Sequence, residues 1–119
     1  MIYVGTDIVE VDRIKALIDR WPAKFLKRIF TPDEIAYCER QAAPGIHFAG
    51  RFAAKEAVKK ALYAAGEVTP IFFRQIQVGR TPQGVPLVRL ASLGQRALQV
   101  SISHTGRHAI ATAILETDD

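Results

Sequence analysis

The stretch from Gly50 to Leu62 most constrains what this chain can fold into, because its composition is that of a helix. Alanine, lysine, glutamate and leucine dominate it, and neither glycine nor proline falls between Arg51 and Ala65. At about 100° per residue, one face of this helix carries six small or branched apolar residues: Ala53, Ala54, Ala57, Val58, Ala61 and Leu62. A face made mostly of alanine lets a neighbouring element approach closely, so we expect it to be buried.

The opposite face of the same helix carries Phe52, Glu56, Lys60 and Tyr63. Two aromatic residues on a face that would otherwise meet water indicate that this face is covered too. A covered carboxylate needs a cation, either a protein ammonium or a metal ion. Glu56 and Lys60 also stand at i and i+4, where an exposed pair is worth only a few tenths of a kcal/mol. The helix alone leaves open both a surface ion pair and a functional carboxylate.

Length and composition are those of an ordinary globular protein. The 119 residues suit one domain over 1–119, and 49% are hydrophobic. No apolar run is long enough to cross a bilayer and no signal peptide is recognisable, so we expect no membrane partner. The single cysteine, Cys38, excludes an intrachain disulfide and is typical of a cytoplasmic protein. The net charge of +4 favours an anionic partner: a nucleic acid, a phosphate-bearing ligand or an acidic protein.

Asp7 lies in the middle of the first predicted strand, residues 2–9. Alternation places Gly5 and Asp7 on one face of this strand and Val4 and Ile8 on the other. Aspartate is a poor strand residue, so Asp7 either faces water or is compensated by a hydrogen bond, a charge or a metal. Gly5 leaves room beside Asp7 for a ligand or for another backbone.

Two further helices are predicted between this strand and the long helix. Asp12 is the expected N-cap of the first, with Arg13 and Arg20 on the flank of its apolar stripe. This arginine row is either a solvated face or a docking site for an acidic helix. The run 31–34, Thr-Pro-Asp-Glu, forms a capping box that starts the second helix, and the run 43–45, Ala-Pro-Gly, is expected to break it.

The second half of the chain is strand-like. Strands are predicted at 71–78, 85–90, 100–104 and 109–115, with a short helix at 92–97. One strand, then helices, then strands indicates the α+β class. Ser103 and His104 are neighbours and would point to opposite faces of a strand, so they do not form a nucleophile–base pair. His104, at a strand end, is better placed to donate a hydrogen bond to a phosphate or a base edge, whereas His47 is expected to be a surface or capping residue.

Four segments together resemble the holo-[acyl-carrier-protein] synthase family, the small bacterial 4′-phosphopantetheinyl transferases. They are residues 5–14, 28–34, 48–62 and 101–104, which follow the family's order and span almost the whole chain. The segment 48–62, FAGRFAAKEAVKKAL, is the most specific of them. The resemblance implies the 4′-phosphopantetheinyl transferase-like α+β fold, in which an antiparallel sheet packs with a long central helix and shorter helices.

The resemblance also implies an enzyme of fatty acid biosynthesis. It would transfer 4′-phosphopantetheine from coenzyme A to a serine of apo-acyl carrier protein and release adenosine 3′,5′-bisphosphate. Asp7 and Glu56 match the carboxylates that hold Mg²⁺ against the pyrophosphate, and Mg²⁺ accepts two carboxylates together with phosphate and water oxygens. Glu56 and Lys60 match the catalytic residues, with Lys60 on the phosphates. Whether Glu56 or a metal-bound water accepts the serine proton stays open.

The binding residues follow from the same resemblance. Positions that the family uses around coenzyme A are matched by Arg51, Lys60, Ser103, His104 and Thr105. Arg13 and Arg20 match the docking surface for the acidic carrier protein, which gives the net positive charge a specific interpretation. The family is trimeric with active sites between subunits, so we expect a homotrimer. The hairpin run 84–86, Gly-Val-Pro, departs from the family's Gly-Lys-Pro, which puts in doubt a charged contact to the nucleotide there.

Two other functions compete with this hypothesis. A small nucleic-acid-binding module would fit the basic composition, but the basic residues are dispersed, and Asp7 and Glu56 would repel phosphates without a metal. A purely structural subunit would show no metal dependence. Titration with coenzyme A, with and without Mg²⁺, separates these cases, and we expect no nucleic-acid partner.

Overall fold

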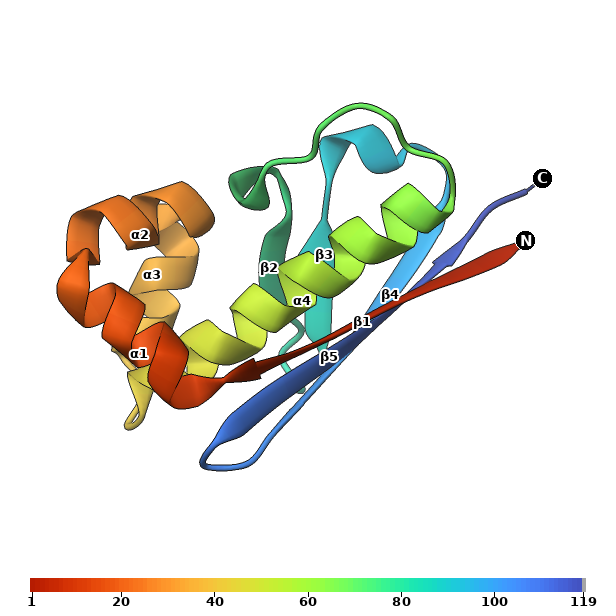
Figure 1. Cartoon of the computed structure of the whole chain (residues 1–119). Helices are drawn as coiled ribbons and strands as arrows, with labels where there is room; N and C mark the ends of the chain where they lie inside the picture. The colour runs from red at the N-terminus through yellow and green to blue at the C-terminus, as the bar shows by residue number, and fades with distance from the viewer. Residues whose placement is uncertain (119) are drawn as a thin grey trace.

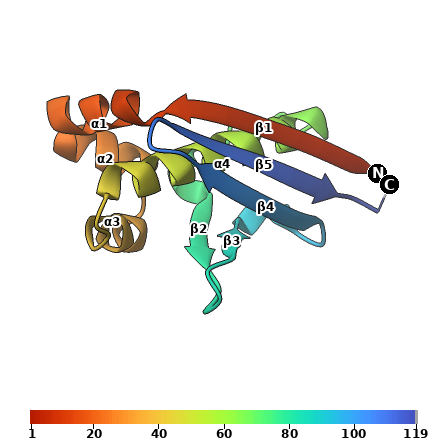
Figure 2. The same ribbon diagram turned by 90° about the horizontal axis from the view of Figure 1, so that it is seen from below.

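The computed structural model describes residues 1–118 and places one long helix across a three-stranded antiparallel sheet (Figure 1). The strand order is β1–β5–β4, from β1 (Ile2–Glu10), β4 (Ala97–His104) and β5 (His108–Glu116). The helix, α4 (Pro44–Ala64), packs on one face of this sheet. Figure 2 views the opposite face, which no other element of residues 1–118 covers.

The remaining elements lie beside α4. Three short helices cluster near its N-terminal end (Figure 1): α1 (Val11–Arg20), α2 (Pro22–Ile29) and α3 (Pro32–Glu39). A separate hairpin consists of β2 (Gln77–Arg80) and β3 (Pro86–Arg89), preceded and followed by 3-10 turns at Phe73–Gln75 and Ala91–Leu93. The predicted α+β class is therefore confirmed.

The alanine face of α4 is buried against the sheet, as its period predicts. All six residues of that face are fully buried: Ala53, Ala54, Ala57, Val58, Ala61 and Leu62. Gly5 of β1 permits the close approach, because a Cβ there would overlap the carbonyl oxygen of Ala57 and lie 2.7 Å from the nitrogen of Ala61. The room predicted beside Gly5 is therefore taken by another backbone.

The outer face of the sheet carries an apolar stripe. Val4 and Ile8 of β1 point away from α4 and are 56% and 63% exposed. In register they lie opposite Ile114 and Ile110 of β5, which are also exposed. We call these four residues the outer stripe.

Several predicted helix boundaries were wrong. Glu10, not Asp12, is the N-cap of α1, and it makes no side-chain capping bond. The run 43–45 separates α3 from the long helix, as predicted, but the long helix already begins at Pro44, earlier than expected, because proline at the first helical position loses no needed N–H donor. His47 consequently lies inside α4. Residues 22–29 form helix α2, which the sequence analysis did not assign.

The second half departs less from expectation. Of the predicted strand 71–78, only Gln77 and Val78 lie in a strand, β2, which continues to Arg80, and the predicted helix 92–97 is the turn Ala91–Leu93. In the first half of the chain, the predicted capping box at the start of α3 is confirmed. The Thr31 backbone N–H donates to Glu34 Oε1 at 2.8 Å, and the Glu34 N–H donates to Thr31 Oγ1 at 3.3 Å. No helix in the described part of the chain is long and apolar enough to span a membrane.

Candidate active site

A cavity of about 470 Å³ lies where the end of β1, the start of α1 and the middle of α4 meet. Asp7 and Glu56, the two predicted metal ligands, both line it, and so do Arg13 and His108. Strand alternation turns Asp7 toward α4, as it does Gly5. The fold therefore brings together two carboxylates that are far apart in the sequence.

One carboxylate oxygen of Asp7 accepts a hydrogen bond, and the other has no partner. Lys60 Nζ donates to Asp7 Oδ1 at 3.1 Å and also to the backbone oxygen of Thr6 at 2.9 Å. Asp7 Oδ2 is buried and has no hydrogen-bond partner within the described chain. A buried polar atom without a partner is uncommon and calls for an explanation, of which an ion is one. The carboxylate thus presents one buried oxygen to which no group of the described chain donates a hydrogen bond.

The donor set of this cavity fits Mg²⁺. No group of three or more histidine, cysteine, aspartate or glutamate side chains within residues 1–118 is arranged to hold a metal. Asp7 and Glu56 supply two hard oxygen donors on one cavity. Mg²⁺ needs no more from a protein, since it keeps several waters and commonly takes phosphate oxygens of a substrate. A structural zinc site, which needs about four protein ligands, does not match.

Glu56 pairs with its neighbour Lys59 and not with Lys60. Lys59 Nζ lies 3.8 Å from Glu56 Oε1 and 4.2 Å from the centroid of the Phe73 ring. Lys60 instead pairs with Asp7 of β1, as described above. Phe52 and Glu56 are half-buried, whereas Lys60 and Tyr63 are exposed, so the expected covering of this helix face is only partial.

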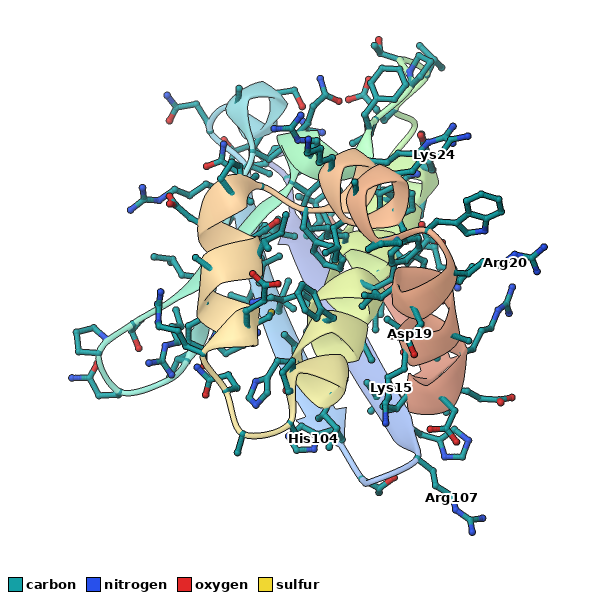
Figure 3. All side chains as sticks on the ribbon, turned by 90° about the vertical axis from the view of Figure 1, so that its left-hand side faces the viewer. Lys15, Asp19, Arg20, Lys24, His104 and Arg107 are labelled. Carbon is teal, nitrogen blue, oxygen red and sulfur yellow. The ribbon has the colours of Figure 1, made fainter. Side chains whose placement is uncertain are left out.

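Arg13 and Arg20 lie on the same helix but in different surroundings. Arg13 lines the cavity of Asp7 and Glu56. Arg20 lies at the end of α1, with its guanidinium 5.3 Å from the Trp21 ring, and Lys24 lies 5.8 Å from the same ring. Figure 3 shows Arg20 and Lys24 on the outer side of the helical cluster. The arginine row is thus an exposed basic surface that begins at the cavity.

Arg51 lies in a second cavity, of about 290 Å³, between α3, α4 and the β2–β3 hairpin. Its guanidinium stands 4.2 Å from the Tyr37 ring, and that of Arg80 stands 4.5 Å from the same ring. Arg51 is only 9% exposed, and its Nε has no hydrogen-bond partner in the described residues. Two guanidiniums around one ring, with an unpaired buried donor, make this cavity suitable for an anion.

The three predicted residues at the end of β4 are exposed. His104 lies at the edge of the sheet (Figure 3), with its ring 6.3 Å from that of His47. Burial lowers the pKa of His47, and the positive charges of Arg51, His104 and Arg80 lower it further. Arg51 and His104 therefore both lie close enough to His47 to affect its protonation.

Ser103 and Thr105 flank His104. Ser103 is exposed. The hydroxyl of Thr105 accepts hydrogen bonds from the backbone N–H groups of Arg107 and His108, so it shapes the β4–β5 turn.

The sequence analysis missed a buried ion pair. Lys55, which is fully buried, donates to Glu34 Oε1 at 2.7 Å and to the backbone oxygens of Ile29 and Phe73 at 2.8 and 3.1 Å. Glu34 Oε2 accepts from the Val78 N–H at 2.6 Å. A signal existed, because the helical period places Lys55 beside Leu62, at the edge of the apolar face of α4. Arg80 and Tyr37, which surround Arg51, gave no signal because their approach depends on the tertiary fold.

Comparison with known proteins places the chain in a family. The family model described as the 4′-phosphopantetheinyl transferase superfamily matches residues 3–113. The holo-[acyl-carrier-protein] synthase of Ruminiclostridium cellulolyticum is 42% identical over 125 residues, which cover 98% of this chain and 92% of that protein. The holo-[acyl-carrier-protein] synthase of Chlamydia trachomatis serovar L2 is 42% identical over 120 residues, covering 98% and 100%. The chain belongs to the holo-[acyl-carrier-protein] synthase family.

Solved structures of holo-[acyl-carrier-protein] synthases share the fold. The Chronobacterium ammoniagenes complex with CoA superposes with a TM-score of 0.87 at 29% identity, covering 100% of this chain and 99% of that one. The Helicobacter pylori holo-[acyl-carrier-protein] synthase in complex with coenzyme A gives 0.82 at 34% identity, covering 95% and 99%. The predicted family, the predicted transferase-like fold and the prediction of an enzyme are confirmed.

Proposed function

We propose that this chain transfers the 4′-phosphopantetheine group of coenzyme A to a serine of apo-acyl carrier protein. The products are holo-acyl carrier protein and adenosine 3′,5′-bisphosphate, and the reaction supports fatty acid biosynthesis. In a chain of this family, the observation that carries the proposal is that Asp7 and Glu56 line one cavity while Asp7 Oδ2 has no partner there. In a module that binds nucleic acid, two carboxylates at the cavity would only weaken binding, because they repel the phosphates.

Asp7 and Glu56 would hold Mg²⁺ in this enzyme. When bound there, Mg²⁺ neutralises charge on the pyrophosphate and stabilises the charge that develops during phosphoryl transfer. Lys60 stands beside Asp7 with its side chain about half exposed, at 54%, so its ammonium is within reach of phosphate oxygens as well. Asp7 acts as a ligand, and Lys60 acts as a phosphate-binding and catalytic residue.

The transfer forms one bond to phosphorus and breaks another. The serine oxygen bonds to the phosphorus that carries pantetheine, and the bond from that phosphorus to the bridging oxygen breaks, so the electron pair leaves with adenosine 3′,5′-bisphosphate. Glu56 accepts the serine proton, because its carboxylate lines the cavity and its side chain is 30% exposed.

Arg51 and the end of β4 bind the nucleotide part of coenzyme A. Arg51 offers an unpaired Nε, and His104 lies in the same cationic region; Ser103 and Thr105 flank His104. The hairpin lacks the lysine that the family pattern has, and Val85 is exposed at that turn. Arg80, on β2 of the same hairpin, supplies a positive charge there instead.

Each active site is completed by a second copy, and the assembly is a homotrimer. In support, the cavity of Asp7 and Glu56 and the cavity of Arg51 share no lining residue in the described chain. A single coenzyme A that used both sets of residues within one chain would have to leave one cavity to reach the other. The outer stripe is an exposed apolar sheet face of the kind that marks a protein interface. The number of copies follows the family resemblance.

The acidic carrier protein docks on the basic surface of α1. Arg13 lines the reaction cavity and Arg20 lies further along the same helix, so a negatively charged helix on this surface would present its serine to the cavity.

We further propose that residues 1–119 act as one transferase domain in the cytoplasm; Asp119 lies outside the described residues. Burial raises the pKa of the Cys38 thiol to about 11, which leaves it an inert packing residue.

Intact mass spectrometry tests the reaction directly. Apo-acyl carrier protein is incubated with the protein, coenzyme A and Mg²⁺, beside an EDTA control and the Asp7→Ala variant. We expect the carrier to gain one phosphopantetheinyl group, and both controls to abolish the gain. No gain with several carrier proteins, from a folded protein, would overturn the proposal.

A further inference from the structure

Both carboxylates proposed for the metal already have an ammonium group from the chain itself. Lys60 Nζ lies 3.1 Å from Asp7 Oδ1, and Lys59 Nζ lies 3.8 Å from Glu56 Oε1. The two lysines are adjacent in α4, yet they serve different carboxylates on different elements. The arrangement therefore supplies one internal cation for each proposed ligand.

Each of these ammonium groups is held by a second contact. Lys60 Nζ also donates to the Thr6 backbone oxygen at 2.9 Å, which ties it to β1. Lys59 Nζ lies 4.2 Å from the centroid of the Phe73 ring, a cation–π contact. Phe73 in turn stacks on Phe52, a residue that lines the same cavity. These second contacts make the pairing with the carboxylates more than a chance meeting of surface charges.

The charges around the cavity are consequently balanced. Its lining carries the carboxylates of Asp7, Glu10 and Glu56 and the guanidinium of Arg13. Lys59 and Lys60 add two positive charges at its edge, so three negative groups face three positive ones. A divalent cation gains little from such a site, because the two ammonium groups repel it and already neutralise the carboxylates, although Asp7 Oδ2 itself has no hydrogen-bond partner in the described residues. A pyrophosphate adds negative charge and gives both lysines alternative partners.

We propose that Lys59 and Lys60 act as built-in counter-cations that make divalent-cation binding depend on the anionic substrate. On the chain alone, the cation competes with both ammonium groups and binds weakly. When a pyrophosphate-bearing ligand enters, the lysines turn to its phosphate oxygens, and the carboxylates become free for the cation. By linkage, the cation must strengthen ligand binding by the same factor. The inference rests on the proposed function only for the identity of this ligand.

Direct Mn²⁺ binding, measured from the EPR signal of free Mn²⁺, tests the inference without any turnover. The wild type is compared with Lys59→Met, Lys60→Met and the double variant, each with and without coenzyme A. Lys27→Met, an exposed lysine on α2, is the matched charge control. Lys59→Arg and Lys60→Arg keep the charges, and urea unfolding confirms that every variant is folded.

Without coenzyme A, the double variant should bind Mn²⁺ at least about tenfold more tightly than the wild type, because the competing ammonium groups are gone. The Lys27→Met control and the arginine variants should stay within about twofold of the wild type. Coenzyme A should tighten Mn²⁺ binding to the wild type by at least about tenfold, and this gain should shrink in the double variant.

Unchanged or weaker Mn²⁺ binding by the double variant in the absence of coenzyme A would overturn the inference, because that arm involves no substrate. An undiminished coenzyme A effect in the double variant would overturn it equally. If the wild type bound neither Mn²⁺ nor coenzyme A and modified no carrier protein, the proposed function would fail as well. If the wild type transferred the group normally while the double variant gave either of the first two results, the proposed function would stand and the role of the lysines would be rejected.

Discussion

Replacing Lys55 by methionine should strongly destabilise the fold, although the change is far from the proposed chemistry. Methionine matches the lysine stem in length but cannot donate a hydrogen bond. The variant therefore loses the 2.7 Å contact to Glu34 and the contacts to the backbone oxygens of Ile29 and Phe73 at 2.8 and 3.1 Å. Glu34, only 3% exposed, then keeps a negative charge without a countercharge.

The expected loss follows from what remains around Glu34. Removing one partner of a buried pair typically costs about 3–5 kcal/mol. Two backbone N–H groups, of Thr31 and Val78, still donate to the Glu34 carboxylate at 2.8 and 2.6 Å. They partly replace the lost donor, so we expect a loss near 3 kcal/mol, at the lower end of that range. Lys59→Met is the matched control on the same helix, and as a loosely paired, more accessible lysine it should cost less than about 1 kcal/mol.

Urea unfolding followed by circular dichroism measures both losses, and a second substitution identifies the cause. Adding Glu34→Gln to Lys55→Met removes the uncompensated charge and should recover part of the loss. A loss no larger than that of Lys59→Met, or no recovery in the double variant, would refute this account of the pair.

Four further predictions follow from individual contacts. Gly5→Ala should cost on the order of 2–3 kcal/mol or more, because the new Cβ overlaps the Ala57 carbonyl oxygen; a loss below about 1 kcal/mol in urea unfolding would show that β1 and α4 separate easily. Asp7→Asn should reduce phosphopantetheinyl transfer at least about 100-fold in the mass assay while leaving the unfolding midpoint nearly unchanged, since it keeps the shape and removes the charge. Burial lowers the pKa of His47 below its ordinary value of 6.5, so the unfolded state takes up the proton first and stability falls as the pH drops below about 6.5; His47→Gln should flatten that slope, and equal slopes would contradict the assignment. Ile114→Lys places a charge in the outer stripe and should lower the mass measured by light scattering to that of a monomer, whereas an unchanged assembly would exclude this face as the interface.

Local periodicity was enough to predict the parts of the fold that place the carboxylates. The helical period marked the alanine face of α4, and strand alternation placed Gly5 and Asp7 on the face that meets it. The glycine then determined how near the two elements lie. Because each of these inferences needs only the sequence within a few residues, the tertiary fold did not override them.

Prolines were ambiguous for a physical reason. Pro22 and Pro44 both follow helical segments, and a proline there either ends one helix or begins the next. In the structure each does the second, at the first position of α2 and of α4. The difference depends on whether the following residues find a core to pack on, which the local sequence does not state. For this reason the extent of α4 and the position of His47 were missed.

The ion-pair partners of charged side chains were the hardest part to predict, because each partner depends on which element packs against that face of the helix. Lys55, Lys59 and Lys60 share one helix but end at Glu34, Glu56 and Asp7. Glu34 was assigned to a capping box and then set aside, although a carboxylate has two oxygens and several lone pairs.

Counting acceptor oxygens instead of residues separates the two kinds of carboxylate in this chain. Both oxygens of Glu34 are used: Oε1 accepts from Thr31 and Lys55, and Oε2 accepts from Val78. Asp7 has Oδ1 engaged by Lys60 and a buried Oδ2 with no partner in the described residues. A satisfied buried carboxylate is what a fold needs to hold its elements together, whereas an unsatisfied one costs stability and persists where something else binds. The unpaired oxygen of Asp7 is therefore stronger evidence for a functional site than the spacing of Glu56 and Lys60, from which the sequence analysis began.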